Sequence, residues 1–96
     1  MHNFISIEPI KHEGLMPSMD IFADLDKTVT VVFTGKNGGD YDKRAAAEQG
    51  LKEGVILTVS NIEVGSWNSE VYFEEIPGVS FNSVMFLELE NYLALQ

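Results

Sequence analysis

A glycine-rich loop is one feature of this chain whose residue types could do chemistry. Residues 35–39 read GKNGG and lie between an expected strand and an expected helix, where phosphate-cradling loops occur. The loop lacks the Gly-Lys-Ser/Thr ending of a P-loop, and Asp40 and Asp42 follow it at the start of the helix. Two carboxylates at that position repel phosphate and already satisfy the helix dipole. We therefore expect an ordinary turn here.

The other polar residues offer few candidates for metal binding or nucleophilic catalysis. His2 and His12 are the only histidines, cysteine is absent, and no cluster has metal-ligand spacing. We expect both histidines to be solvated, and no Gly-x-Ser-x-Gly nucleophile turn is present. Glu74 and Glu75 would point to opposite faces of a strand, so they are not expected to share a proton. The sequence predicts no metal site, no cofactor and no enzymatic activity.

One short segment, in contrast, resembles a catalytic motif. Residues 21–29, IFADLDKTV, resemble the first motif of haloacid-dehalogenase-like phosphatases. The resemblance implies that Asp24 is a nucleophile and Asp26 an acid/base at a magnesium site, on a doubly wound parallel sheet. However, a strand is expected directly after the motif, and 96 residues are too few for that sheet with its crossover helices. We favour a loop or helix end that leads into the strand.

Composition and charge bound the remaining function classes. The chain has 96 residues, enough for one domain, and 45% of them are hydrophobic, which is typical of a globular protein. Six Lys and Arg against 15 Asp and Glu give a net charge of −9, which disfavours direct binding to nucleic acid or to an anionic membrane. No run approaches the roughly 20 apolar residues that cross a bilayer. The N-terminus has no secretory-signal pattern, so we expect a cytoplasmic protein.

The acidic residues are unevenly distributed. Residues 55–96 contain six glutamates and no Lys or Arg. Such a surplus can serve solubility alone. If the glutamates line one face, however, they imitate the phosphate spacing of a nucleic acid and could occupy the binding channel of a nucleic-acid-binding protein.

The first half of the chain predicts one strong strand and one short helix. Residues 28–34, TVTVVFT, alternate with period two and are rich in β-branched side chains, which indicates a strand. A helix is expected over residues 42–49, capped by Asp40 or Asp42 and ended by Gly50 in the left-handed conformation.

The second half predicts further strands. Apolar residues of the segment 55–64 change parity part-way, so we expect a strand with a bulge or bend near residues 60–61. Shorter strands are expected over residues 67–74, 79–81 and 84–90, with a turn at Pro77-Gly78.

The two ends of the chain carry weaker patterns. Residues 5–10 alternate as an edge strand does, although Pro9 limits pairing. Ser18 could cap a helix with apolar residues at helical spacing over 21–25, and Tyr92 and Leu93 suggest a docked tail.

Together these elements favour a mainly β fold, a small and strongly bent five-stranded barrel with one short helix. Residues 51–59 resemble the loop that enters a strand in Src-homology-3-like barrels. Residues 77–84 resemble the short strand and one-turn helix that precede the last strand of such barrels. The resemblance covers about residues 28–90. We expect a β-barrel domain over 28–96 and an N-terminal extension over 1–27 that packs on or flanks it.

Three segments of the same stretch also resemble short, uncharacterised proteins of bacteriophages and bacterial mobile elements. They are residues 33–38 (FTGKNG), 64–67 (VGSW) and 81–86 (FNSVMF). This resemblance implies a phage or mobile-element accessory protein, and it supplies no catalytic residues.

Two aromatic residues are candidates for a contact surface. Trp67 shares strand parity with Val71, which favours the core, but its position after a Gly-Ser turn suits an exposed anchor, and both alternatives stay open. Tyr72 has the opposite parity, together with Glu70 and Glu74. One aromatic ring among carboxylates suits a basic protein surface or a cationic ligand.

The preferred hypothesis is a non-enzymatic acidic interaction protein that binds and inhibits a basic or nucleic-acid-binding host protein, such as a defence nuclease. The expected contact residues are Trp67, Glu70, Tyr72, Glu74 and Glu75. A second hypothesis is a protein that sequesters a small molecule. A third is a magnesium-dependent phosphatase that uses Asp24 and Asp26.

Overall fold

The fold is a six-stranded antiparallel sheet with two short helices. It is given by a computed structural model that describes residues 3–96. The mainly β fold expected from the sequence is confirmed. The elements in chain order are β1 (Ile5–Ser6), β2 (Thr30–Phe33), α1 (Asp40–Glu48), β3 (Val55–Glu63), β4 (Glu70–Phe73), β5 (Ile76–Asn82), the 3-10 turn η1 (Ser83–Met85), β6 (Phe86–Glu88) and α2 (Leu89–Leu93).

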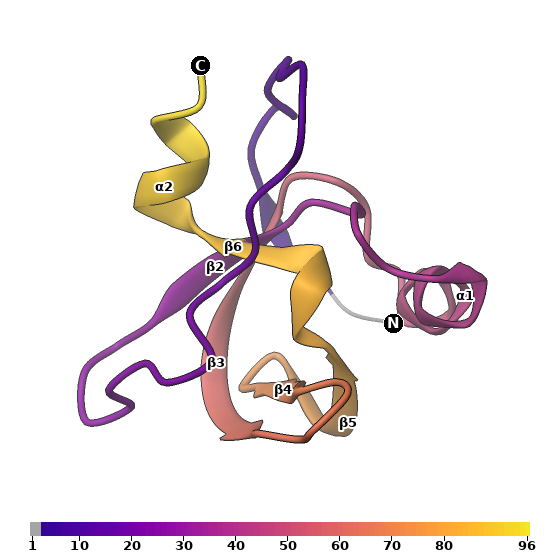
Figure 1. Cartoon of the computed structure of the whole chain (residues 1–96), viewed down its shortest axis with the longest axis vertical. Coiled ribbons are helices and arrows are strands. Elements are labelled where there is room, and N and C mark those ends of the chain that lie inside the picture. The colour runs from indigo at the N-terminus through magenta and orange to yellow at the C-terminus, as the bar shows by residue number, and fades with distance from the viewer. Residues whose placement is uncertain (1–2) are drawn as a thin grey trace.

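The long strand β3 joins the two halves of the sheet. The strand order is β5-β4-β3-β2-β6, and β1 also pairs with β3. The first part of β3 pairs with β2 and its second part with β4, with a register shift between Val59 and Asn61. The bulge expected at residues 60–61 is confirmed. It turns Val59 and Ile62 toward the same core although their parity differs. Figure 1 shows the resulting curve of β3 between the two halves.

The sheet is strongly bent, but its described pairings do not close it. Strands β5 and β6 end the hydrogen-bonded path, and η1 connects them. The sheet has six strands, one more than the five that we expected.

Aromatic rings fill the inside of the bend. Phe33, Phe73, Phe81 and Phe86 are buried there, and the ring centroids of Phe73 and Phe86 lie 4.7 Å apart. Burial of each such side chain contributes about 1.5–3 kcal/mol to stability. This core makes the β3–β4–β5 ribbon a firm support for the side chains on its outer face.

A smaller apolar cluster covers the outer face of β2 and β6. Val32, Leu87 and Tyr92 are its buried members, and Ile7 and Ile10 pack against them from the N-terminal segment. Tyr92 belongs to α2, and its hydroxyl accepts a hydrogen bond from the backbone N–H of Ile10 at 3.1 Å. Of the docked tail expected at residues 92–93, Tyr92 is buried, in helical form, whereas Leu93 is 47% exposed.

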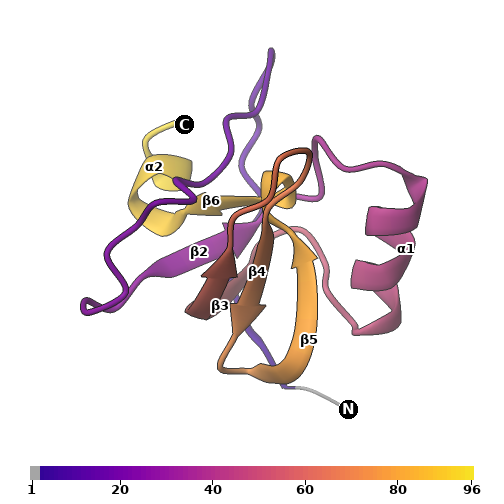
Figure 2. The same ribbon diagram turned by 60° about the horizontal axis from the view of Figure 1, so that its bottom comes forward.

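Helix α1 has the ends that the sequence predicted, within two residues. The Asp42 carboxylate accepts a hydrogen bond from the backbone N–H of Gly39 at 3.1 Å and so caps the helix. Gly50 follows the helix at a φ of +82°, the left-handed conformation that glycine favours. Within the helix only Ala46 is buried, and Figure 2 shows α1 beside the sheet rather than across it.

Several expected boundaries were wrong. The residues 18–25 form no helix, because the backbone N–H groups of Phe22 and Asp26, which a helix would use, donate to the side chains of Asp20 and Asp24. Pro77 and Gly78 lie within β5, and the tight turn is at residues 74–75. The third and last predicted strands are shorter than expected, since β4 begins at Glu70 and β6 ends at Glu88. Over residues 3–96, no helix is long and apolar enough to cross a membrane.

Candidate binding surface at the β3–β4 hairpin

Two glutamates face each other where β3 and β4 meet their connecting loop. Glu63 and Glu70 are register partners and the last pair before the loop of residues 64–69. Like charges directly opposite each other on neighbouring strands destabilise a sheet. Each carboxylate is held by a hydroxyl: Tyr72 donates to Glu63, and Ser80 donates to Glu70 at 3.3 Å. The outer face of the hairpin therefore carries concentrated negative charge on ordered side chains.

Tyr72 lies on the same face as these two carboxylates, two residues beyond Glu70 along β4. Its hydrogen bond to Glu63 raises the pKa of the phenol above the usual value of 10.0, and a weaker contribution from Ser80 lowers it. The ring therefore stays neutral at ordinary pH and keeps its proton for Glu63. The parity predicted for Tyr72 and Glu70 is confirmed, since Val71 and Phe73 are buried on the opposite face.

Trp67 is 96% exposed, so the core alternative for this residue was wrong. Strand parity does not extend to Trp67, because β4 begins three residues later at Glu70. The indole lies instead in the loop of residues 64–69, where Val64 is also 52% exposed. An isolated tryptophan on a protein surface is a common anchor for a partner.

The loop that carries Trp67 is braced from within. Gly65 lies so close to the carbonyl oxygen of Asn68 that any Cβ at this position would collide with it. The backbone N–H of Gly65 donates to the Ser69 hydroxyl at 3.3 Å, and the Ser69 carbonyl accepts from Ser83 at 2.9 Å. Ser69 itself is buried. These contacts tie the loop to η1 and fix its conformation.

A second set of hydrogen bonds connects the same loop to helix α1. The Asn82 side-chain amide donates to the Asp42 carboxylate at 3.1 Å and to the Asn68 side chain at 3.5 Å. Its oxygen accepts from the backbone N–H of Val84 at 3.3 Å. Asn82 is 7% exposed, whereas Asp42 is half-buried and Asn68 is exposed, so the network runs from beneath the surface out to the loop. We call Asp42, Asn82 and Asn68 the polar bridge.

The polar bridge ends next to an aromatic residue on each side. Trp67 precedes Asn68, and Tyr41, which is 79% exposed, precedes Asp42. Sequence reasoning missed Tyr41. The sequence does contain a signal for its exposure: Tyr41 is five residues before Ala46, so the two side chains point about 140° apart around the helix. Because Ala46 is the residue that α1 buries, this spacing directs Tyr41 to solvent.

The two remaining predicted contact residues, Glu74 and Glu75, lie at the other end of β4. The Glu75 carboxylate accepts hydrogen bonds from the backbone N–H and the hydroxyl of Thr58, at 2.8 and 2.9 Å. Glu75 therefore satisfies a strand N–H of β3 next to the bulge. Trp67, Glu70 and Tyr72 gather at the hairpin loop, whereas Glu74 and Glu75 lie beyond Phe73, the last residue of the strand.

The two aspartates of the phosphatase-like motif lie in a turn. The Asp24 carboxylate accepts a hydrogen bond from the backbone N–H of Asp26 at 3.0 Å, and β2 follows. The sheet that follows is antiparallel, whereas the motif requires a parallel one. Within residues 3–96 no three His, Asp or Glu side chains form a group that could hold a metal ion. His12 contacts the carbonyl oxygen of Leu15, and His2 lies outside the described residues.

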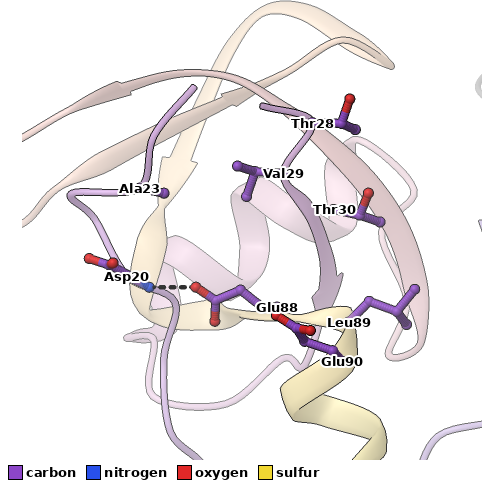
Figure 3. Close-up of a pocket in the computed structure, with 8 residues that line it drawn as sticks. All are labelled: Asp20, Ala23, Thr28, Val29, Thr30, Glu88, Leu89 and Glu90. Carbon is purple, nitrogen blue, oxygen red and sulfur yellow. Dashed lines mark hydrogen bonds between the residues drawn. The ribbon is translucent and has the colours of Figure 1, made fainter. Parts of the chain in front are cut away.

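A pocket of about 390 Å³ lies between the segment before β2 and the start of α2. Figure 3 shows the Glu88 carboxylate in it, accepting a hydrogen bond from the backbone N–H of Asp20 at 2.9 Å. Its lining combines three carboxylates, two hydroxyls and three apolar side chains, from Asp20, Ala23, Thr28, Val29, Thr30, Glu88, Leu89 and Glu90.

Comparison with known proteins gives one match. A family model described as bacteriophage T4 protein Y07B matches residues 27–93. The chain belongs to this phage protein family. The resemblance to phage proteins is thereby confirmed, and the matched region contains the hairpin, α1 and the polar bridge. No curated protein and no solved structure matches the chain.

Proposed function

We propose that this Y07B-family protein is a non-enzymatic interaction protein, which docks on a basic protein through the loop end of the β3–β4 hairpin. The observation that carries the proposal is Trp67, 96% exposed on a braced loop that the glutamate pair Glu63 and Glu70 closes. A braced loop loses little backbone entropy when a residue on it binds, and the two glutamates at its base steer a positively charged partner toward it.

The charge distribution supports a basic partner. The chain has a net charge of −9, and residues 55–96, which include the whole hairpin, contain no Lys or Arg. The partner in this proposal is a basic or nucleic-acid-binding host protein, such as a defence nuclease, whose nucleic-acid channel the acidic face blocks. The proposal places this encounter in the cytoplasm of the host cell.

The architecture proposed to present this surface is a Src-homology-3-like barrel. The three-stranded β3–β4–β5 meander, the short η1 turn and the return of β6 to pair with β2 support this assignment. The rim of such a small barrel is where partners commonly bind.

Affinity capture from host-cell extract tests the proposal. The baits are the wild-type protein and Glu70→Lys/Glu74→Lys, with Glu8→Lys/Glu13→Lys as a control that makes the same change of net charge in the N-terminal segment. We expect one or more basic proteins to bind the wild type and the control at low salt but not the hairpin variant. Because salt at 1 M shortens the screening length to about 3 Å, the same proteins should elute at high salt.

The result that would contradict the proposal is equally concrete. Capture of the same partner by Glu70→Lys/Glu74→Lys, or capture that high salt leaves unchanged, removes the electrostatic docking mechanism. Circular dichroism of each bait establishes that the substitutions leave the sheet folded.

The pocket at Glu88 favours a second candidate function, the binding of a small cationic molecule. Its carboxylates Asp20, Glu88 and Glu90 would attract a positive charge, and Val29 and Leu89 provide apolar contact. Native mass spectrometry of the protein purified from host cells tests this candidate. A retained low-mass ligand that is lost on Leu89→Arg supports it, and ligand-free protein contradicts it.

A further inference from the structure

Two exposed aromatic residues lie on segments that hydrogen bonds between distant parts of the chain connect. Tyr41 and Trp67 each adjoin one end of the polar bridge, in which Asn82 binds Asp42 at 3.1 Å and Asn68 at 3.5 Å. Figure 2 shows the β3–β4 loop and the segment that enters α1 at the same end of the molecule. Neither ring belongs to the core, because both side chains are exposed to solvent.

We propose that Tyr41 and Trp67 form one docking surface whose occupant is an arginine-bearing segment of the basic partner. This inference rests on the proposed function and specifies the chemistry of the partner. It extends the surface from the hairpin to the first turn of α1. It also gives the polar bridge a role, since the bridge connects the two segments that carry these residues.

Arginine fits this surface better than lysine does. A guanidinium group is planar and weakly hydrated, so it stacks on an aromatic ring, while its fork of N–H donors pairs with carboxylates. Each of the two segments carries a carboxylate, since Asp40 precedes Tyr41 in the sequence and Glu70 directly follows the loop that carries Trp67. An ammonium group is a compact point charge that offers neither the stacking nor the fork.

The opposed glutamates add a reason for a cation at this place. Glu63 and Glu70 face each other in the register of β3 and β4, at a cost to the free protein. A guanidinium bound nearby reduces their mutual repulsion, so binding offsets the loss of stability that the opposed charges cause in the free protein. On the α1 side, Lys43 and Arg44 follow Tyr41 by two and three residues and oppose a cation there, so the charge attraction comes from the hairpin glutamates.

Trp67 makes the test direct, since it is the single tryptophan of the chain and its fluorescence reports on this surface alone. The probes are two peptides of equal length and charge, one with arginine and the other with lysine at every basic position. We expect the arginine peptide to bind the wild type more tightly. Tyr41→Ala should weaken that binding by about two- to fivefold, the size of an exposed cation–π contact. Tyr41→Phe should retain it.

The controls separate this inference from the function on which it rests. Phe22→Ala removes another exposed aromatic side chain, 77% exposed and outside the surface, and should leave both affinities unchanged. Equal affinity for the two peptides, or wild-type affinity of Tyr41→Ala, overturns the inference. The proposed function survives that result if Glu70→Lys/Glu74→Lys still abolishes binding. If that variant binds both peptides as the wild type does, both proposals fail.

Discussion

Substitution of Asn82 by alanine tests whether the polar bridge holds the hairpin loop against α1. The variant loses a hydrogen bond to the charged Asp42 at 3.1 Å, one from Val84 at 3.3 Å and a long one to Asn68 at 3.5 Å. The first is worth about 1.5 kcal/mol, the second about 0.5–1 kcal/mol and the third little. The free energy of unfolding should therefore fall by about 2–3 kcal/mol, and Tm by roughly 10–20 °C for a chain of this size.

Urea unfolding followed by far-ultraviolet circular dichroism measures this loss. Trp67 fluorescence is unsuitable as a folding probe because the indole is exposed in the native state. The matched control is Asn91→Ala, an exposed asparagine with one long bond of 3.4 Å to Glu88, which should change stability by less than about 0.5 kcal/mol.

A double-mutant cycle isolates the contact within the bridge. Asp42→Ala and Asn82→Ala should be less than additive by about 1 kcal/mol, since each removes the same bond. A loss at Asn82 no larger than that at Asn91, or full additivity with Asp42, would refute the bridge as a stabilising connection.

Three further predictions concern other parts of the chain. Glu63→Gln should lower the pKa of Tyr72 toward 10.0, which tyrosinate absorbance measured against Tyr72→Phe detects. Because the pKa is raised in the wild type, this pair stabilises the fold below pH 10.0 and loses that effect as pH rises through the raised value. Gly54→Ala should release β1, because φ is +98° there and a Cβ would collide with the N-terminal backbone, so hydrogen exchange of residues 5–10 should accelerate while that of β4 stays slow. Glu75→Gln should cost about 1 kcal/mol in urea unfolding, since its two bonds to Thr58 lose their charge; an unchanged midpoint would contradict that role.

The parts of the fold that follow from hydrophobic patterning were predictable. The change of parity between Val59 and Ile62 required a bulge, and the register of β3 and β4 contains one. Helix α1 followed from its ends, because a left-handed glycine and an acidic first turn are local signals. Val32 shows the limit of this reasoning. One strand face was expected to be polar, but α2 and the N-terminal segment bury Val32 there.

The errors came from contacts that local patterns do not contain. The segment of residues 18–25 has helical spacing, but β6 holds its start at Met19, and the side chains of Asp20 and Asp24 accept from backbone N–H groups that a helix would use. Pro77 and Gly78 suggested a turn and instead lie in a register shift at the edge strand β5, a position that tolerates proline. Strand parity does not apply to Trp67, since the residue lies in the loop that ends just before Glu70.

Part of the candidate site could be predicted from strand alternation, and part depends on contacts between distant residues. Glu70 and Tyr72 lie on one strand and share its outer face, so alternation placed them together. Tyr41 could not be joined to them, because the contact between Asp42 and Asn82 spans 40 residues. A polar bridge of this kind leaves no periodic signal, and only the folded chain brings its members together.

The bonding state of the acidic side chains determines what each can do for a partner. Two hydrogen bonds from Thr58 orient Glu75 and one from Tyr72 orients Glu63, and each carboxylate keeps lone pairs that can accept from a partner. Glu70 holds only a 3.3 Å bond from Ser80 and can exchange it at small cost. In the proposed complex, we expect charge around the loop to act mainly on the rate and orientation of encounter, and Trp67 and Tyr41 to determine the lifetime. It follows that salt should lower the association rate, and that loss of either ring should raise the dissociation rate.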